Sequence, residues 1–186
     1  MARIPTASRD SVPQDQVDAF DQYVAERGSI PETGPLSVML HVPELIQRGE
    51  HLRAYLRGDE SSLPANIREL GMLVAAREMD CQFIWNAHAA LGRRSGLSDE
   101  LVDNLRDKKE LGGLSEAESA VIDYGREFFR THRVGEAAFN AAMAQFGTRG
   151  LVELTTLMGY YACLAFNINA FEVGLPEGIT EPPLPV

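Results

Sequence analysis

The sequence feature that most constrains the fold is the segment of residues 151–171, whose apolar side chains would cover nearly every face of a helix. Such a helix has to be buried on all sides, so other elements must surround it. The alternation of Val, Ile and Thr with polar residues that is typical of strands is almost absent, so those elements are expected to be helices. We therefore predict an all-α protein, a bundle of about six to eight helices with no sheet.

Helical periodicity recurs along most of the chain, with apolar residues three and four apart and with glycines, prolines and capping residues at the expected ends. Ser115 followed by Glu118, for example, has the pattern of a capping box. Besides the apolar segment, helices are expected at 13–27, 43–58, from 64 onward, 81–91, from 98 onward, 115–131 and 135–146.

The chain divides into three parts by composition. Residues 1–35 form an N-terminal helix and a Pro/Gly-rich connector, and residues 36–173 form the helical domain. Residues 174–186 form a Pro-rich tail that cannot be helical, because proline lacks the N–H that a helix interior needs. We expect this tail to lie on the surface or against a neighbouring subunit.

Charge and composition exclude several classes of function. The 186 residues carry a formal net charge of −10, with no basic stripe, so nucleic acid is an unsuitable partner. No uninterrupted apolar span, signal peptide or nucleotide-binding glycine loop is evident, so neither a membrane location nor a cofactor is expected. The two cysteines are too few for a secreted disulfide framework, which makes the cytoplasm the default location.

The residues best suited to chemistry lie between 68 and 88. Cys81 and His88 are seven positions apart, which places them on one face of a helix with Ile84 between them. Glu69 precedes Cys81 by twelve residues and on one straight helix would point about 120° away. A break in the helix near Asp80 would allow Glu69 to face the same cleft.

His88 and Cys81 suggest two different chemistries. A histidine is the natural residue for proton transfer near neutral pH, although it also occurs as a packed interior residue. A cysteine in the first turn of a helix is activated by unpaired N–H groups, but the acids Glu78 and Asp80 oppose this effect. The sequence leaves the sign of that balance open, and Cys81 also fits a buried, inert position.

Other side chains are candidates for binding. Trp85 flanks the same face and suits a pocket wall, and His41 stands at the entrance of a helix from which it could reach a site. Cys81 and His88 provide only two of the three protein ligands that zinc requires, so no metal site is expected.

These residues resemble a known family. Arg68-Glu69-Leu70, Trp85-Asn86-Ala87-His88 and Gly96-Leu97-Ser98-Asp99-Glu100 are similar to the hallmark segments of carboxymuconolactone decarboxylase-like and alkylhydroperoxidase D-like proteins. The resemblance covers roughly residues 36–173. It implies an alkylhydroperoxidase D-like helical bundle that assembles into trimers or hexamers.

The family resemblance also implies site residues. Its peroxidase members carry a Cys-x-x-Cys pair, and the matching positions here are Cys81 and Ile84, with His88 and Glu69 in the accompanying histidine and glutamate positions. Its decarboxylase members tend to have glutamate where this chain has Ile84. The chain therefore lacks a second thiol in contact with the first, which a disulfide relay needs.

Three functions follow from these considerations. The first is a decarboxylase or lyase of aromatic catabolism that acts on a small carboxylated lactone or ring-derived acid, with His88 as acid/base and Glu69 or Arg77 holding a carboxylate. The second is an antioxidant, peroxiredoxin-type peroxide reductase that uses Cys81 and an external thiol. The third is a non-catalytic helical binding module.

Overall fold

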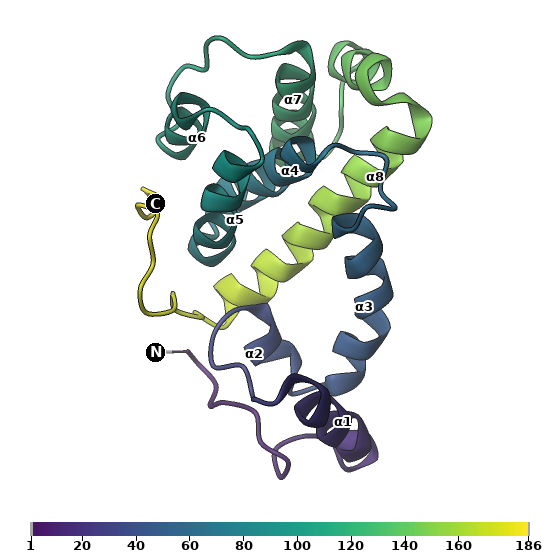
Figure 1. Ribbon diagram of the computed structural model, residues 1–186, viewed down its shortest axis with the longest axis vertical. Helices are drawn as coiled ribbons and strands as arrows, with labels where there is room; N and C mark the ends of the chain where they lie inside the picture. Colours follow the sequence, from purple (N-terminus) through teal and green to yellow (C-terminus); the bar gives the residue numbers. More distant parts are fainter. Residues whose placement is uncertain (1, 186) are drawn as a thin grey trace.

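The computed structural model describes residues 2–185, and within that range it contains helices and no strand (Figure 1). This confirms the predicted all-α class. The elements are η1 (Gln14–Gln16), α1 (Val17–Arg27), α2 (Pro35–Met39), α3 (Pro43–Arg57), α4 (Ala65–Glu78), α5 (Gln82–Arg94), α6 (Asp99–Arg106), α7 (Glu116–Thr131) and α8 (Glu136–Ala170).

Helix α4 is the most completely enclosed element. Every residue from 70 to 77 is buried, and α5, α7 and α8 pack around it. The apolar segment expected at the centre forms the second part of α8, but it is not buried on all sides, because Val152 and Phe166 are 60% and 63% exposed. That part of the prediction was wrong: α4 occupies the centre, and α8 covers it with one face only.

Helix α8 also joins two segments that the sequence separates. Gly147 was expected to end a helix, and it does adopt a non-helical backbone with φ of 64°. A residue with a side chain rarely adopts this left-handed conformation, whereas glycine adopts it without cost. The chain then resumes a helical path at once, so the break is a kink inside α8 rather than a loop (Figure 1).

The break between α4 and α5 occurs where the sequence indicates it. Helix α4 ends at Glu78, Asp80 has a positive φ of 47°, and Cys81 is the N-cap residue of α5. The turn folds α5 back against α4, so two helices that are adjacent in sequence become neighbours in the core. The predicted capping box is confirmed, because Ser115 and Glu118 form it in full on α7, and the helix expected from position 98 begins with Ser98 as its cap.

The N-terminal region has a small hydrophobic cluster of its own. It gathers side chains from the first segment, α1 and the start of α3, and it lies apart from the main core. Its buried members are Ala7, Val12, Val17, Phe20, Tyr23, Leu40 and Ile46. Helix α2, which the sequence did not indicate, connects this cluster to α8.

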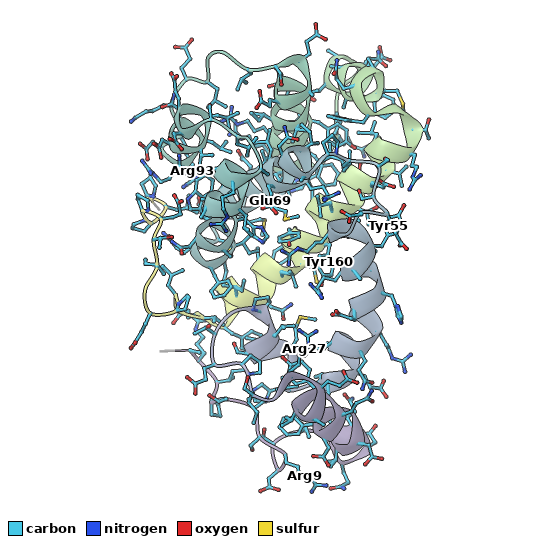
Figure 2. All side chains as sticks on the ribbon, viewed as in Figure 1. Arg9, Arg27, Tyr55, Glu69, Arg93 and Tyr160 are labelled. Carbon is cyan, nitrogen blue, oxygen red and sulfur yellow. The ribbon has the colours of Figure 1, made fainter. Side chains whose placement is uncertain are left out.

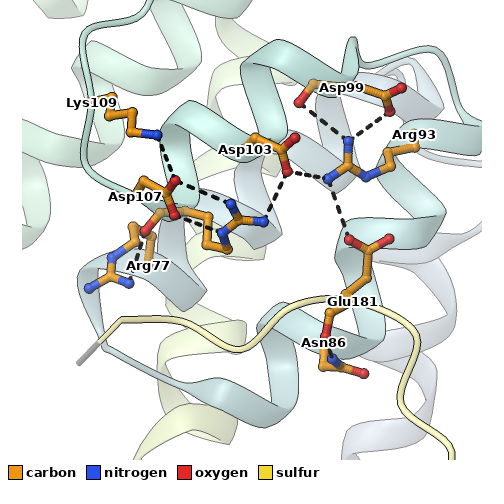
Figure 3. Close-up of polar contacts among 9 residues, drawn as sticks. Arg77, Asn86, Arg93, Asp99, Asp103, Asp107, Lys109 and Glu181 are labelled. Atoms are coloured by element: carbon orange, nitrogen blue, oxygen red, sulfur yellow. Dashed lines mark hydrogen bonds and ion pairs between the residues drawn. The ribbon is translucent and has the colours of Figure 1, made fainter.

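The Pro-rich tail lies along the outer face of α5 (Figure 3). Asn86 donates a hydrogen bond to the backbone oxygen of Glu181, while the Glu181 carboxylate is 3.4 Å from Arg93. Further along, Gln82 exchanges two hydrogen bonds with the backbone of Leu184, whose side chain is buried. The tail is therefore attached to the surface of its own chain.

Helix α8 is long and apolar enough, by length and composition alone, to cross a bilayer. The sequence suggested no such span. Half of the apolar stretch is buried inside the protein, as in the core helix of a globular fold, so the feature is weak evidence for a membrane location.

Candidate functional site

The site centres on a hydrogen bond between two helices. Glu69 lies near the start of α4 and His88 lies in the middle of α5, and the break at Asp80 brings these residues together although 19 positions separate them. The His88 Nδ1 atom is 2.8 Å from the Glu69 Oε2 atom. Because an ionised carboxylate can only accept a hydrogen bond, Nδ1 carries the hydrogen and Nε2 remains free for other chemistry.

This pair is largely shielded from water. The His88 side chain is 7% exposed and that of Glu69 is 14% exposed. The ring of Tyr161 packs edge-on against His88, with 5.0 Å between the ring centroids. Packing and the hydrogen bond together fix the orientation of the imidazole, as a proton-transferring group requires.

His88 lines a cavity of about 220 Å³. This volume lies below the range of roughly 300–1,000 Å³ typical of sites for drug-sized molecules, so the cavity suits a small ligand. Its walls are mainly apolar and come from α2, α5 and α8; they include Leu36, Phe83, Ile84, Ala87 and Leu164.

Three arginines also line the cavity. Arg27 comes from the end of α1, and Arg53 and Arg57 come from the last turns of α3. Arg53 Nε donates to Glu50 at 2.9 Å, and Arg27 lies 3.5 Å from the same carboxylate. Across residues 2–185, Arg57 forms no ion pair. Glu50 pairs with two of these guanidinium groups and the third has no ion-pair partner within residues 2–185, which gives the cavity a local positive excess in a protein whose net charge is −10.

Two tyrosines of α8 complete the lining. Figure 2 shows Tyr160 near the middle of the molecule, between Glu69 and Arg27. Burial raises the pKa of both Tyr160 and Tyr161, and the effect is larger at Tyr161, which is almost fully enclosed. Both phenols therefore stay protonated near neutral pH and can donate hydrogen bonds.

Cys81 does not reach this cavity. Its side chain is fully buried in the main core, and burial raises the pKa of its thiol although the N–H groups of Ile84 and Phe83 oppose the rise. The sequence left the sign of this balance open, and desolvation decides it. The other cysteine, Cys163, is exposed, and neither forms a disulfide.

The remaining predicted binding residues also lie elsewhere. Trp85 is 1% exposed in the core, and His41 Nε2 is 3.0 Å from the backbone oxygen of Pro5. The buried Arg77 guanidinium pairs with Asp80 and donates to backbone oxygens of Arg106 and Pro185. None of these three side chains lines the cavity. Their contacts are with the rest of the fold, so we assign them structural roles.

Sequence reasoning did not identify the arginines. Arg53 and Arg57 are four residues apart on one helix, which could have marked them as a cationic face. That spacing is equally typical of a solvated helix surface, and it gains significance only because residues of α3, α5 and α8 line one cavity. No group of three or more His, Cys, Asp or Glu side chains placed to hold a metal ion occurs within residues 2–185.

The sequence matches no protein-family model and no curated protein. Solved structures do match its fold. The chain is similar to a protein from Ralstonia eutropha JMP134, described as an uncharacterised peroxidase-related protein with an alkylhydroperoxidase AhpD core; the TM-score is 0.71 with 15% identity over 95% of this chain and 93% of that one.

Two further structures are similar. An uncharacterised peroxidase-related protein from Silicibacter sp. TM1040 gives a TM-score of 0.69 with 17% identity over 93% of this chain and 91% of that chain. A candidate AhpD antioxidant defence protein of unknown function from Agrobacterium tumefaciens gives 0.66 with 21% identity over 74% and 94% of the two chains. At these identities the matches establish a common fold, and the chemistry has to be argued from the site.

Proposed function

We propose that this chain, which has the alkylhydroperoxidase D-like fold, is a decarboxylase or lyase-type enzyme that performs acid/base chemistry on a small carboxylated lactone or ring-derived acid. The observation that carries the proposal is the position of His88. The same imidazole is hydrogen-bonded to Glu69 through Nδ1 and borders a small cavity that also holds arginines. A proton carrier, an apolar wall and a cationic group thus meet in one enclosure.

Each part of the cavity has a role in this proposal. The apolar walls hold the ring of the substrate, and Arg57, whose guanidinium has no ion-pair partner within residues 2–185, binds a carboxylate. His88 transfers a proton between Nε2 and a ring carbon. Glu69 is a positioning residue that holds the Nδ1 tautomer and balances the charge of the protonated ring.

The position of the arginines constrains the substrate further. A guanidinium that bound the departing carboxylate would stabilise the ground state more than the transition state, because the negative charge leaves that group as the bond breaks. Arg57 is therefore expected to hold a carboxylate that the product retains. The departing carboxylate would lie against the apolar wall near Ile84.

A thiol-dependent peroxide reductase is the second candidate. The descriptions of the structural neighbours as peroxidase-related favour it. The environment of Cys81 does not, because a buried thiol with a raised pKa is a poor nucleophile and Ile84 occupies the position of a second thiol. A binding module that uses the same cavity without chemistry is the third candidate.

Two single variants separate these candidates. Assays would compare turnover of a panel of carboxylated lactones with reduction of hydrogen peroxide by dithiothreitol. His88→Ala should lower lactone turnover by roughly 10²–10⁴-fold, as expected for the loss of a general acid/base, while Cys81→Ser should retain it. Peroxide turnover that Cys81→Ser abolishes would support the peroxidase instead. Turnover in neither assay, with ligand binding retained, would support the binding module.

We further propose that the protein forms a homo-oligomer, a trimer or a hexamer. Large apolar side chains are exposed on α3 and α8, and Leu52 and Val152 border one groove between these helices. Light scattering should give a multiple of 20.5 kDa at micromolar concentration. Val152→Asp should reduce the mass, whereas Phe139→Asp, a change at an exposed phenylalanine in the first part of α8, should leave it unchanged. A monomeric wild type would contradict this proposal.

A further inference from the structure

The buried and half-buried tyrosines fall into two sets by the hydrogen bonding of their hydroxyl groups. The Tyr124 hydroxyl is 2.8 Å from Thr155 Oγ1, and the Tyr55 hydroxyl donates to Glu153 at 2.6 Å. Tyr161 and Tyr23 are 3% and 8% exposed, and neither hydroxyl has a hydrogen-bond partner within residues 2–185; of these two, Tyr161 lines the cavity and Tyr23 does not. Buried tyrosine hydroxyls usually have a partner, and for a hydroxyl of a residue that lines a cavity this partner can be a bound ligand.

The surroundings of Tyr161 indicate where the partner belongs. Tyr161 lines the cavity that His88 borders, and its ring contacts the imidazole edge-on. Arg57 lines the same cavity, so the phenol, the proposed carboxylate-binding arginine and His88 border one enclosure. This tyrosine thus belongs to the lining of the proposed site.

We infer that the Tyr161 hydroxyl donates a hydrogen bond to a carbonyl oxygen of the substrate, and that it stabilises the enolate that forms at this oxygen during the reaction. This inference rests on the proposed function. Tyr161 is then a catalytic residue in addition to His88. It selects substrates in which a ring carbonyl accompanies the carboxylate, as in a lactone acid, over ring acids that have no carbonyl.

The atoms and electrons of the step balance with these groups. The bond between the ring and the departing carboxylate breaks, carbon dioxide leaves, and the electron pair moves through the conjugated system onto the carbonyl oxygen. The Tyr161 O–H group donates to that oxygen and keeps its proton, because burial raises the pKa of the phenol. Protonated His88 then delivers the Nε2 proton to a ring carbon, which restores the carbonyl, and water reprotonates the imidazole.

The inference predicts a difference between two matched ligands. 5-Oxotetrahydrofuran-2-carboxylate is a saturated lactone acid that carries both the carboxylate and the ring carbonyl, and tetrahydrofuran-2-carboxylate lacks only the carbonyl oxygen. Titration calorimetry or NMR titration of the wild type should give a dissociation constant about tenfold lower for the lactone acid, the usual scale of one net hydrogen bond. Tyr161→Phe should remove this preference and leave the binding of the second ligand unchanged.

Two further variants serve as controls. Arg57→Met should weaken the binding of both ligands by the same factor, because it removes the partner of the carboxylate that they share. Tyr124→Phe removes a buried hydroxyl that does have a partner, so it should lower the melting temperature and keep the ligand preference. Tyr161→Phe, which removes a hydroxyl without a partner, should leave the melting temperature unchanged or higher.

The possible results separate the inference from the proposed function. A tenfold preference that disappears in Tyr161→Phe supports both. Equal binding of the two ligands by the wild type, weakened in Arg57→Met, would overturn the role of Tyr161 and leave the carboxylate site intact. If neither ligand binds, or if binding ignores Arg57, the proposed function fails and the inference fails with it.

Discussion

Glu69 and Glu153 are both well-buried carboxylates that connect distant parts of the chain, yet their partners differ. Glu153 on α8 accepts hydrogen bonds from the hydroxyls of Tyr55, Ser61 and Ser62, from the Ser62 N–H group and from Arg149. Among the side chains of residues 2–185, Glu69 has one partner, His88. The first carboxylate is saturated with donors, whereas the second is left with a single partner beside a cavity.

This difference separates a structural carboxylate from a functional one. The donors around Glu153 favour its charged form and lower its pKa to about 2, and they fasten the turn before α4 to α8. No proton can be exchanged there without breaking several bonds at once. Within residues 2–185 the side-chain partner of Glu69 is His88, which lines a cavity, so a bound ligand can contact this pair while the surrounding helices keep their packing.

The largest predicted effect is on stability and concerns Glu153. Glu153→Ala leaves a group of donors without an acceptor, and breaking such a buried network typically costs 3–5 kcal/mol, about 10 °C in melting temperature for a chain of this size. Thermal unfolding measures this loss. Enzyme activity below the transition should stay unchanged, and a selective loss of activity would erase the distinction drawn between the two carboxylates.

The acid dependence of stability should follow from the same carboxylate. Because the pKa of Glu153 is lowered in the folded protein, its contribution to stability is complete above the unfolded value of about 4.5 and is lost as pH falls toward about 2. The stability deficit of Glu153→Ala relative to the wild type should therefore shrink across this pH range. Denaturant titrations at several pH values would measure it, and a constant deficit down to pH 2 would contradict the assignment.

The next effect concerns activity. Glu69→Gln keeps the size of the side chain but removes the charge that orients and balances His88. We expect a loss of roughly 10–100-fold in kcat, the usual cost of losing a group that orients a functional histidine. The melting temperature should change by far less than in Glu153→Ala. A fall in stability with unchanged kcat would make Glu69 a structural residue as well.

The smallest effect concerns the thiols. Cys163 is exposed and should react with a thiol reagent at the rate of an ordinary surface cysteine. Cys81 should react only as fast as the protein opens, because its sulfur is buried and its pKa is raised. Mass spectrometry of the labelled protein distinguishes the two sites. Faster labelling of Cys81 than of free cysteine would support the peroxidase candidate.

The sequence predicts the local features of this fold well because they depend on neighbouring residues. The serine caps and the break at Asp80 follow from residues within one turn of each feature. The break, in turn, is what allows Glu69 and His88 to meet. The resemblance of short segments to a known family supplied the fold, and the similar solved structures support it.

The sequence could not predict which helix faces meet each other. Cys81 was placed on the face of His88 by counting helical turns. It is instead the N-cap residue, with an extended backbone, and α5 begins at Gln82, so helical periodicity does not determine where the Cys81 side chain lies. The positive excess at the cavity arises because arginines of α1 and α3 line the same cavity as residues of α5 and α8, and apolar spacing within each helix does not encode that arrangement. Burial of α8 on all sides failed as a prediction for the same reason.

The attachment of the tail to α5 has a consequence for the order in which the molecule is built. Glu181 follows Asn86 by 95 positions, so during translation α4 and α5 can pair long before the segment that covers the outer face of α5 has been made. Until then, Asn86 and Gln82 lack the backbone partners that the tail provides, whereas Arg93 can already pair with Asp99 and Asp103 of α6. The nascent chain would therefore form the Glu69–His88 pair first, and the tail would cover the outer face of α5 last.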